Sequence, residues 1–224
     1  MIYMLYQTFN KTIFNVILLL LVCLYSCKKD KEEQGIVKAN KSLVIAVDAA
    51  HGGSDTGTIS EAGYLEKDLM IVLCNKLASL AKEYNITAVP TRTADKNTTT
   101  EERIAIADAT EAAIFLSFHI NRNVPGKPVA SGYEIIVAGN TPYYAKSKQL
   151  ASQLIAGFHV AKTQTIYTEK NVIILATNAR PAIAIECGFQ DNTEDLATIL
   201  DEKKLEIMCR RVLSSIVNYS NAQQ

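Results

Sequence analysis

The sequence lacks an excess of charge of either sign. It has 23 basic and 23 acidic side chains, so its formal net charge at pH 7 is zero. A nucleic-acid-binding surface needs clustered, excess lysine and arginine, so nucleic acid is excluded as a partner. No internal repeat or long low-complexity tract is visible. Hydrophobic residues make up 48% and charged residues 21% of the 224 residues, which is typical of one globular domain.

Cysteine is also scarce. The chain has five cysteines, of which Cys23 and Cys27 lie close to the N-terminus. The other three are Cys74, Cys187 and Cys209, an odd number with no C-x-x-C spacing. This pattern excludes a complete disulfide framework and a zinc site built from thiolates. We interpret these three cysteines as buried, small apolar residues.

The N-terminus is apolar and nearly without charge up to Cys27. Residues 1–26 contain one charged side chain, Lys11, and an apolar run from Ile13 to Tyr25 that only Asn15 interrupts. The run is short for a membrane span but suits the apolar part of a secretory signal. A small residue, Ser26, and then Cys27 follow the run, which resembles a bacterial lipoprotein signal. We predict that residues 1–27 are a lipoprotein-like signal segment and that Cys27 is lipidated, so that the membrane is a partner through a lipid anchor. The alternative is an uncleaved N-terminal anchor; both place the domain outside the cytoplasm, in the periplasm or cell envelope.

The rest of the chain alternates between apolar runs and stretches of helical periodicity. Residues 28–41 are rich in Lys and Glu and are predicted to be a flexible tether, followed by one folded domain over 42–220. Strands are predicted at 43–47, 86–89, 113–118, 132–138, 172–175 and 182–187, and helices at 65–82, 100–109 (with Thr100 as N-cap), 142–158 and 202–219. This alternation predicts an α/β fold: a single domain with a twisted, mostly parallel sheet of about six strands and helices on both faces.

Two of the three histidines follow buried strands. His51 comes just after the first apolar run, and His119 directly follows the run that ends at Phe118. Since the carboxyl ends of parallel strands share one edge of a sheet, both histidines are expected there. Glu66 begins the helix that follows the first strand and can reach the same edge. Two histidines and one carboxylate are a common catalytic zinc set that leaves a position for water, so we predict one Zn²⁺ per chain on His51, Glu66 and His119.

Glu186 is the predicted acid/base. It lies in the otherwise apolar strand 182–187, where an unpaired carboxylate is costly and needs a partner. Activation of a water molecule beside a metal ion meets that need. Each residue also has a plainer interpretation: a loop or core histidine for His51 and His119, a first-turn acid favoured by the helix dipole for Glu66, and a buried ion-pair partner for Glu186. Their joint place at strand ends favours the metal site.

Two glycines and several polar residues complete the set of candidates. We expect Gly52 and Gly53 to let a metal and a substrate approach the backbone closely, the alternative being a simple turn. Asn121 and Glu134 are candidate substrate contacts; the alternatives are a loop cap for Asn121 and a solvent-facing strand position for Glu134. Three other residues are expected to be structural. Arg92 and Arg103 are expected to form ion pairs, and His159 is expected to be a surface or core histidine.

Around these residues the sequence resembles the zinc-dependent N-acetylmuramoyl-L-alanine amidases of the amidase-3 type, which hydrolyse peptidoglycan. The matching stretches run in the family's order and cover about residues 42–218: Val47–Gly57, Gly63–Leu69, Thr91–Asp95, Arg103 with Ala107, Phe115–Asn121, Gly132–Glu134 and Pro181–Phe189. The resemblance implies that residues 42–220 are a zinc amidase catalytic domain, that His51, Glu66 and His119 are the zinc ligands, and that Glu186 is the catalytic acid/base.

The implied reaction is hydrolysis of the amide between the lactyl group of N-acetylmuramic acid and L-alanine of the stem peptide, for cell-wall remodelling or cell separation. Peptidoglycan is the implied partner, and the sequence does not identify a protein activator. Some positions depart from the family's pattern: Ala49-Ala50 replaces Pro-Gly, Asp108 stands where Asn is frequent, and Gln190-Asp191 replaces Leu-Ser. Two other functions are compatible with the sequence: a zinc peptidase that cleaves stem peptides, and a non-catalytic lipoprotein that binds peptidoglycan.

Overall fold

The computed structural model describes residues 35–127, 129–158, 163–170 and 172–223. The predicted signal segment 1–27 with Cys27, residues 28–34 of the predicted tether, and His159 lie outside the described residues. The helices and strands all belong to one unit of the chain, Val37–Gln224. In the described part of the chain, no helix is both long and apolar enough to span a membrane.

Six strands form one sheet, in the order β2-β1-β3-β6-β4-β5. Strand β1 pairs in parallel with β2 and β3, and β3 pairs in parallel with β6. Strand β4 runs antiparallel to β6 and parallel to β5. The bounds are Leu43–Ala49 (β1), Ile86–Pro90 (β2), Ile114–Asn121 (β3), Gly132–Ala138 (β4), Thr163–Glu169 (β5) and Ala182–Phe189 (β6). The predicted mostly parallel sheet is confirmed.

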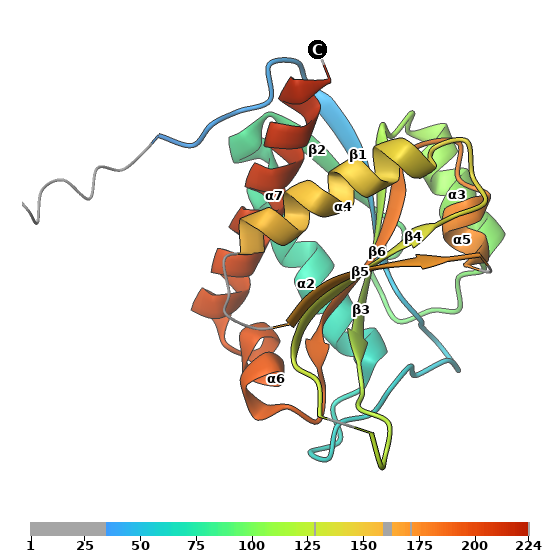
Figure 1. Ribbon diagram of the computed structural model, residues 1–224, viewed down its shortest axis with the longest axis vertical. Helices are drawn as coiled ribbons and strands as arrows, with labels where there is room; N and C mark the ends of the chain where they lie inside the picture. Colours follow the sequence, from blue (N-terminus) through green and yellow to red (C-terminus); the bar gives the residue numbers. More distant parts are fainter. Residues whose placement is uncertain (1–34, 128, 159–162, 171, 224) are drawn as a thin grey trace, which may run out of the picture. The chain divides into compact units, whose positions relative to one another are not determined.

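Helices cover both faces of this sheet, as predicted (Figure 1). Helices α2, α4 and α7 pack on one face over the larger apolar core, and α3 and α5 pack on the other face over a smaller one. The continuous apolar sequences of β1, β3 and β6 follow from this two-sided burial. The helices are Glu66–Ala81 (α2), Thr100–Ala109 (α3), Tyr144–Phe158 (α4), Ile173–Ala176 (α5), Thr193–Leu200 (α6) and Glu202–Ala222 (α7), with a 3₁₀ turn at Lys82–Tyr84.

Three local predictions are wrong. Residues 172–175, predicted as a strand, form the short helix α5, because a brief apolar run does not distinguish strand from helix. The fifth strand is instead β5, an edge strand of mostly polar residues that has no apolar run. The N-cap of α3 is Thr99, not Thr100: its hydroxyl accepts from the Glu102 N–H, while the Glu102 carboxylate accepts from the Thr99 N–H.

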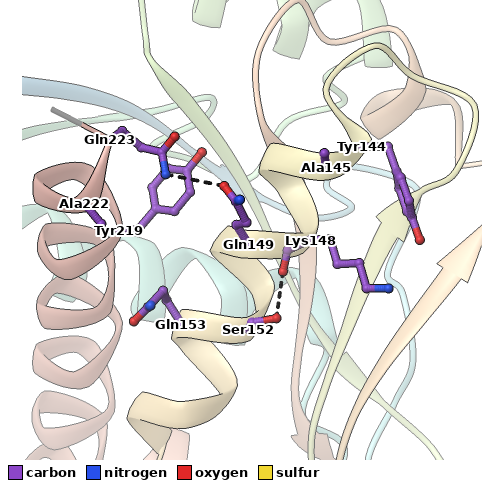
Figure 2. Close-up of a pocket in the computed structure, with 9 residues that line it drawn as sticks. All are labelled: Tyr144, Ala145, Lys148, Gln149, Ser152, Gln153, Tyr219, Ala222 and Gln223. Atoms are coloured by element: carbon purple, nitrogen blue, oxygen red, sulfur yellow. Dashed lines mark hydrogen bonds between the residues drawn. The ribbon is translucent and has the colours of Figure 1, made fainter.

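A hollow lies between α4 and α7 on the side of the larger core (Figure 2). Its described lining consists of small and amide side chains, one lysine and two tyrosines: Tyr144, Ala145, Lys148, Gln149, Ser152, Gln153, Tyr219, Ala222 and Gln223. A hydrogen bond from Gln223 to Gln149 crosses it at 3.4 Å. None of these described lining residues is a histidine, cysteine or carboxylate, so the chemistry lies elsewhere.

The predicted site lies at the edge of the sheet where the carboxyl ends of β1, β3 and β6 meet. Because β4 is antiparallel to β6, the beginning of β4 lies beside the end of β6. Glu134, near the start of β4, therefore reaches the same edge as His119 on β3 and Glu186 on β6.

Candidate metal centre

His51 lies in a tight turn just beyond β1. Its φ of 61° is in the left-handed region, which is uncommon for a residue with a side chain. A buried arginine stabilises this turn: Arg103 donates to the His51 carbonyl at 2.6 Å and to the Ala49 carbonyl at 2.7 Å. Arg103 also forms a 2.6 Å ion pair with buried Asp48, so the expected structural ion pair is confirmed for this arginine. Arg92 donates to backbone carbonyls, including that of Ala50 at 2.7 Å.

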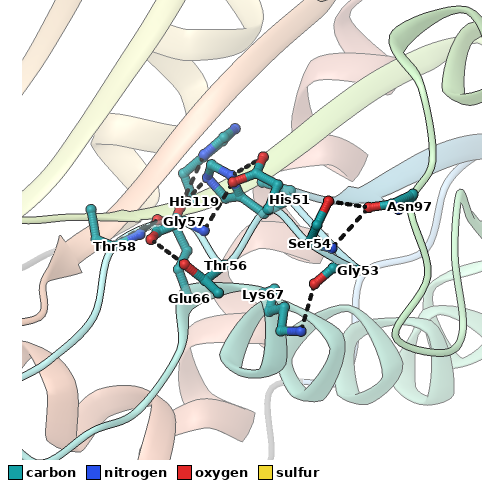
Figure 3. A network of polar contacts seen from close by, with 12 residues as sticks. His51, Gly53, Ser54, Thr56, Gly57, Thr58, Glu66, Lys67, Asn97 and His119 are labelled. Carbon is teal, nitrogen blue, oxygen red and sulfur yellow. Dashed lines mark hydrogen bonds and ion pairs between the residues drawn. The ribbon is translucent and has the colours of Figure 1, made fainter.

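Glu66 brings the two histidines together (Figure 3). Its Oε1 atom lies 3.1 Å from His51 Nε2 and 3.1 Å from His119 Nδ1. One ligand atom from each residue lies within 4.8 Å of the others. Among the described residues, this is the one group of three or more His, Cys, Asp or Glu side chains placed so that it could hold a metal ion. Ligands about 2.0 Å from a tetrahedral zinc ion lie roughly 3.3 Å apart, so the spacing fits zinc.

The rest of the Glu66 carboxylate is fixed by neutral donors. Its Oε2 accepts from the Thr58 N–H at 2.8 Å and from the Thr58 hydroxyl at 2.9 Å. The Ile120 N–H donates to Oε1 at 3.2 Å. Glu66 is 2% exposed, so these contacts hold a buried carboxylate with Oε1 directed at the histidines. Thr58 was not anticipated from the sequence.

The second nitrogen of each histidine has its own partner. His51 Nδ1 lies 2.8 Å from Asp55 Oδ2. His119 Nε2 lies 3.3 Å from the Ser117 hydroxyl, which donates to Asp48 Oδ2 at 2.6 Å. Such contacts fix ring orientation and leave the other nitrogen for a metal, here Nε2 of His51 and Nδ1 of His119. A histidine–metal site is therefore supported beyond its immediate ligands.

The electrostatics without a cation follow from these contacts. The hydrogen bond with Glu66 raises the pKa of His51 to about 9 against the opposing effect of burial. Burial opposes ionisation of Glu66, but hydrogen bonds with His119 and His51 outweigh it and lower its pKa. The site therefore holds a carboxylate that attracts a positive charge, which a proton on His51 or a metal ion can supply.

Glu186 lies across from His119, with which it is paired in register between β3 and β6. It lines the same pocket as His51, Glu66 and His119. Burial raises its pKa to about 7; the neighbouring charge of His119 opposes this shift and those of Glu66 and Glu134 add to it. A carboxyl group with this pKa can both accept and donate a proton near neutral pH.

The two glycines after His51 do not serve the predicted purpose. A Cβ atom on Gly52 would collide with the carbonyl of Lys96, and one on Gly53 with the side chain of Asn97. These glycines therefore make room for the neighbouring loop rather than for a metal. The close approach occurs at Gly57, where a Cβ atom would lie 2.6 Å from Glu66 Oε2 and 2.7 Å from His51 Cδ2.

Asn121 and Glu134 lie beside the four central residues and contact each other. Asn121 Nδ2 donates to Glu134 Oε2 at 3.1 Å. The other oxygen of Glu134 accepts from the Tyr167 hydroxyl, also at 3.1 Å. Tyr167 was missed because β5 was not predicted.

Two residues that depart from the amidase-3 pattern, Gln190 and Asp108, form polar contacts in the structure. Gln190 is buried, and its Nε2 donates to the Thr58 carbonyl at 3.0 Å and also to the Thr58 hydroxyl, next to Glu66. Asp108 forms an ion pair with Arg180, which also donates to the Ala107 carbonyl at 2.6 Å. These contacts give Gln190 and Asp108 structural roles at positions where the amidase-3 pattern has Leu and frequently Asn.

Comparison with known proteins agrees with this geometry. The family model described as N-acetylmuramoyl-L-alanine amidase matches residues 45–218. The chain belongs to the N-acetylmuramoyl-L-alanine amidase family. It is thus an amidase, and the predicted family, enzyme class and fold are confirmed.

Individual members show how far the likeness extends. An uncharacterized Bacillus subtilis protein, YqiI, is 28% identical over 179 residues, covering 78% of this chain and 84% of YqiI. The N-acetylmuramoyl-L-alanine amidase AmiC of Escherichia coli is 28% identical over 161 residues, which cover 70% of this chain but only 38% of AmiC. The structure of an N-acetylmuramoyl-L-alanine amidase from Clostridium difficile is 26% identical, with a TM-score of 0.71, and the match covers 83% of this chain and 100% of that one.

Proposed function

We propose that this amidase is a zinc enzyme that hydrolyses the amide between the lactyl group of N-acetylmuramic acid and L-alanine in peptidoglycan, in cell-wall remodelling or cell separation. One Zn²⁺ per chain is bound by His51, Glu66 and His119. The observation that carries the proposal is the position of Glu66 Oε1, 3.1 Å from a nitrogen of each histidine. Glu186 on the adjacent strand supplies the base.

When bound, zinc acts as a Lewis acid toward the scissile carbonyl and toward water. Glu186 takes a proton from the attacking water as the new C–O bond forms. It then gives that proton to the nitrogen of L-alanine as the C–N bond breaks, so the products are a lactyl carboxylate and a free amine. A pKa of about 7 suits both steps, and no other carboxyl group lining the described pocket has a raised pKa.

Asn121 and Glu134 are proposed as substrate contacts. They lie next to Glu186 and His119 and present an amide and a carboxylate on the same face of the sheet. For the whole protein, we propose an extracytoplasmic location in the periplasm or cell envelope, tethered through lipidated Cys27. The apolar segment and the cysteine that follows it in the sequence support this placement.

The central test compares wild type with Glu186→Ala. We expect Glu186→Ala to retain stoichiometric zinc, measured by elemental analysis, and to lose at least a hundredfold in hydrolysis of purified muropeptides, since a positioned acid/base contributes about 10²–10⁴-fold. Glu111→Ala, which removes an exposed glutamate from the turn after α3, is the matched control and should behave as wild type.

Mass spectrometry of the products separates the rival functions. Lactyl-disaccharide together with an intact peptide supports the amidase. Shortened peptides from wild type would identify a stem-peptide peptidase instead. Binding to peptidoglycan without any product, in protein that contains zinc, would identify a non-catalytic binding protein.

A further inference from the structure

The face of the sheet that carries the metal centre continues past Glu186 to the edge of the sheet. His119 on β3 pairs in register with Glu186 on β6, Glu186 pairs with Glu134 on β4, and Glu134 pairs with Thr165 on β5. Side chains at paired positions of neighbouring strands point to the same face. A row of four polar residues therefore crosses four strands, from the candidate metal ligand to the last strand.

Tyr167 lies on the same face, two residues beyond Thr165. Between them, Ile166 packs against the larger core on the α4 side, so Thr165 and Tyr167 point to the opposite side. Tyr167 is 41% exposed, which leaves much of its ring open to solvent. Its hydroxyl donates to Glu134 at 3.1 Å, and this contact ties the ring to the row.

The chemistry of this surface suits a sugar. Glu134 offers carboxylate oxygens that accept hydrogen bonds from hydroxyl and N-acetyl N–H groups, and the Asn121 side-chain amide can donate and accept. The exposed Tyr167 ring provides an apolar face with a polar edge, on which a pyranose ring can stack. Neighbouring strands are about 4.8 Å apart, so β5 lies roughly 10 Å from Glu186, within reach of a saccharide whose lactyl carbonyl is at the metal.

A second hollow beside the metal centre has a different lining. Its inner part is polar, and its larger apolar residues gather at α5. The full lining is Asp48, Ala50, His51, Asp55, Thr98, Thr100, Arg103, Ser117, His119 and Val172–Ile174. Ile173 is 65% exposed at its rim. An apolar rim suits the methyl group of L-alanine better than it suits sugar hydroxyls. The two arms of the scissile amide therefore have two chemically distinct surfaces.

We infer that Glu134, Thr165 and Tyr167 form the saccharide subsite of this enzyme, with the Tyr167 ring as its platform, and that the peptide arm leaves past Val172–Ile174. This inference rests on the proposed function, since it assigns the two arms of that substrate. Tyr167 acts by binding the sugar and takes no part in proton transfer.

The test measures saccharide binding directly by NMR, with the disaccharide N-acetylglucosaminyl-N-acetylmuramic acid and the free stem peptide as separate probes of the zinc-loaded protein. The disaccharide should shift amide resonances of the three subsite residues, and the peptide those of Val172–Ile174. Tyr167→Ala should weaken disaccharide binding about five- to tenfold and Tyr167→Phe about two- to threefold, from loss of a ring contact and of a single hydrogen bond.

Tyr144 offers a matched control on the opposite side of β5, where its hydroxyl lies 3.4 Å from that of Thr168. Tyr144→Phe and Tyr144→Ala should bind the disaccharide as wild type does. In hydrolysis, Tyr167→Ala should raise KM for a disaccharide-peptide and leave kcat unchanged, with no effect on a lactoyl-peptide that lacks the sugar rings.

The outcomes separate the two proposals. Disaccharide shifts confined to Val172–Ile174, or unchanged affinity in Tyr167→Ala, would overturn the subsite even if hydrolysis is normal. Absence of amide hydrolysis by wild type with the expected binding pattern would overturn the proposed reaction and leave the subsite standing. An equal loss for both substrates in Tyr167→Ala would show a structural role and reject the assignment.

Discussion

Gly57 offers a direct test of the metal centre, because substitution by alanine acts on two candidate ligands at once. The added Cβ atom would lie 2.6 Å from Glu66 Oε2 and 2.7 Å from His51 Cδ2, closer than the 3.0 Å below which such contacts are essentially never found. The Glu66 carboxylate would have to retreat by at least 0.4 Å. Zinc sites tolerate errors of about 0.2 Å in ligand distances, so the ligand would leave its position.

Gly63→Ala is the matched control. Both glycines have positive φ, 62° at Gly57 and 85° at Gly63, but a Cβ atom on Gly63 would meet nothing within 4 Å. Alanine in the left-handed region costs about 1–2 kcal/mol, so Gly63→Ala should lose about this much free energy of unfolding, and Gly57→Ala at least as much because of the added contacts. Only Gly57→Ala should also lose zinc affinity, by at least tenfold, or about 1.4 kcal/mol.

Urea unfolding of the metal-free proteins measures the free energy of unfolding. Competition for zinc against a fluorescent chelator of known affinity measures the zinc affinity. If Gly57→Ala and Gly63→Ala bind zinc equally tightly, Glu66 and His51 are not the ligands in this arrangement, and the metal assignment is wrong. Both variants share the backbone strain of a positive φ, so a difference in zinc affinity between them cannot come from that strain alone.

Three further predictions concern the surroundings of the ligands. Asp55→Ala should weaken zinc binding about tenfold through loss of the partner of His51 Nδ1, whereas the charge control Glu61→Gln should not, as chelator competition can measure. Because the pKa of His51 is raised to about 9 without metal, zinc must displace a proton from His51 between about pH 6.5 and 9, and zinc affinity should rise with pH over this range. Calorimetry in buffers of different ionisation enthalpy measures the number of protons released. A binding enthalpy that does not depend on the buffer would contradict this prediction. Gln190→Leu should leave the free energy of unfolding within about 1 kcal/mol, because its buried Oε1 lacks a hydrogen-bond partner, but should weaken zinc binding a few-fold by releasing Thr58; tight zinc binding in this variant would show that Thr58 needs no support.

The residues of the candidate metal centre were identifiable from sequence because each lies at the start, near the end or just beyond the end of an element with a strong local signal. The apolar runs before His51 and His119 mark strands that are covered on both faces, and parallel strands end at one edge. Glu186 was recognisable as a carboxylate in an apolar strand. These signals depend only on neighbouring residues in the chain, so they can be recognised without knowledge of the fold.

The surrounding contacts were not identifiable in the same way. Thr58 and Gln190 are far apart in sequence, and nothing local marks either as a neighbour of Glu66. Likewise, the role given to Gly52 and Gly53 was wrong, because the atoms that they accommodate belong to Lys96 and Asn97 in a distant loop. Such contacts are set by how loops pack together, which periodicity does not encode.

The sequence by itself determined the α/β class, the two-sided burial of β1, β3 and β6, and the positions of the four candidate residues, three at the ends of these strands and Glu66 at the start of α2. Hydrophobic pattern and chain direction dictate these. Only the tertiary structure decided that β6 inserts between β3 and β4 and that β4 runs antiparallel to it. That pairing places Glu134 beside Glu186 and brings Tyr167 of an edge strand within reach. Strand order is a choice among long-range pairings of similar local sequence, and it is made by the packing of the whole domain.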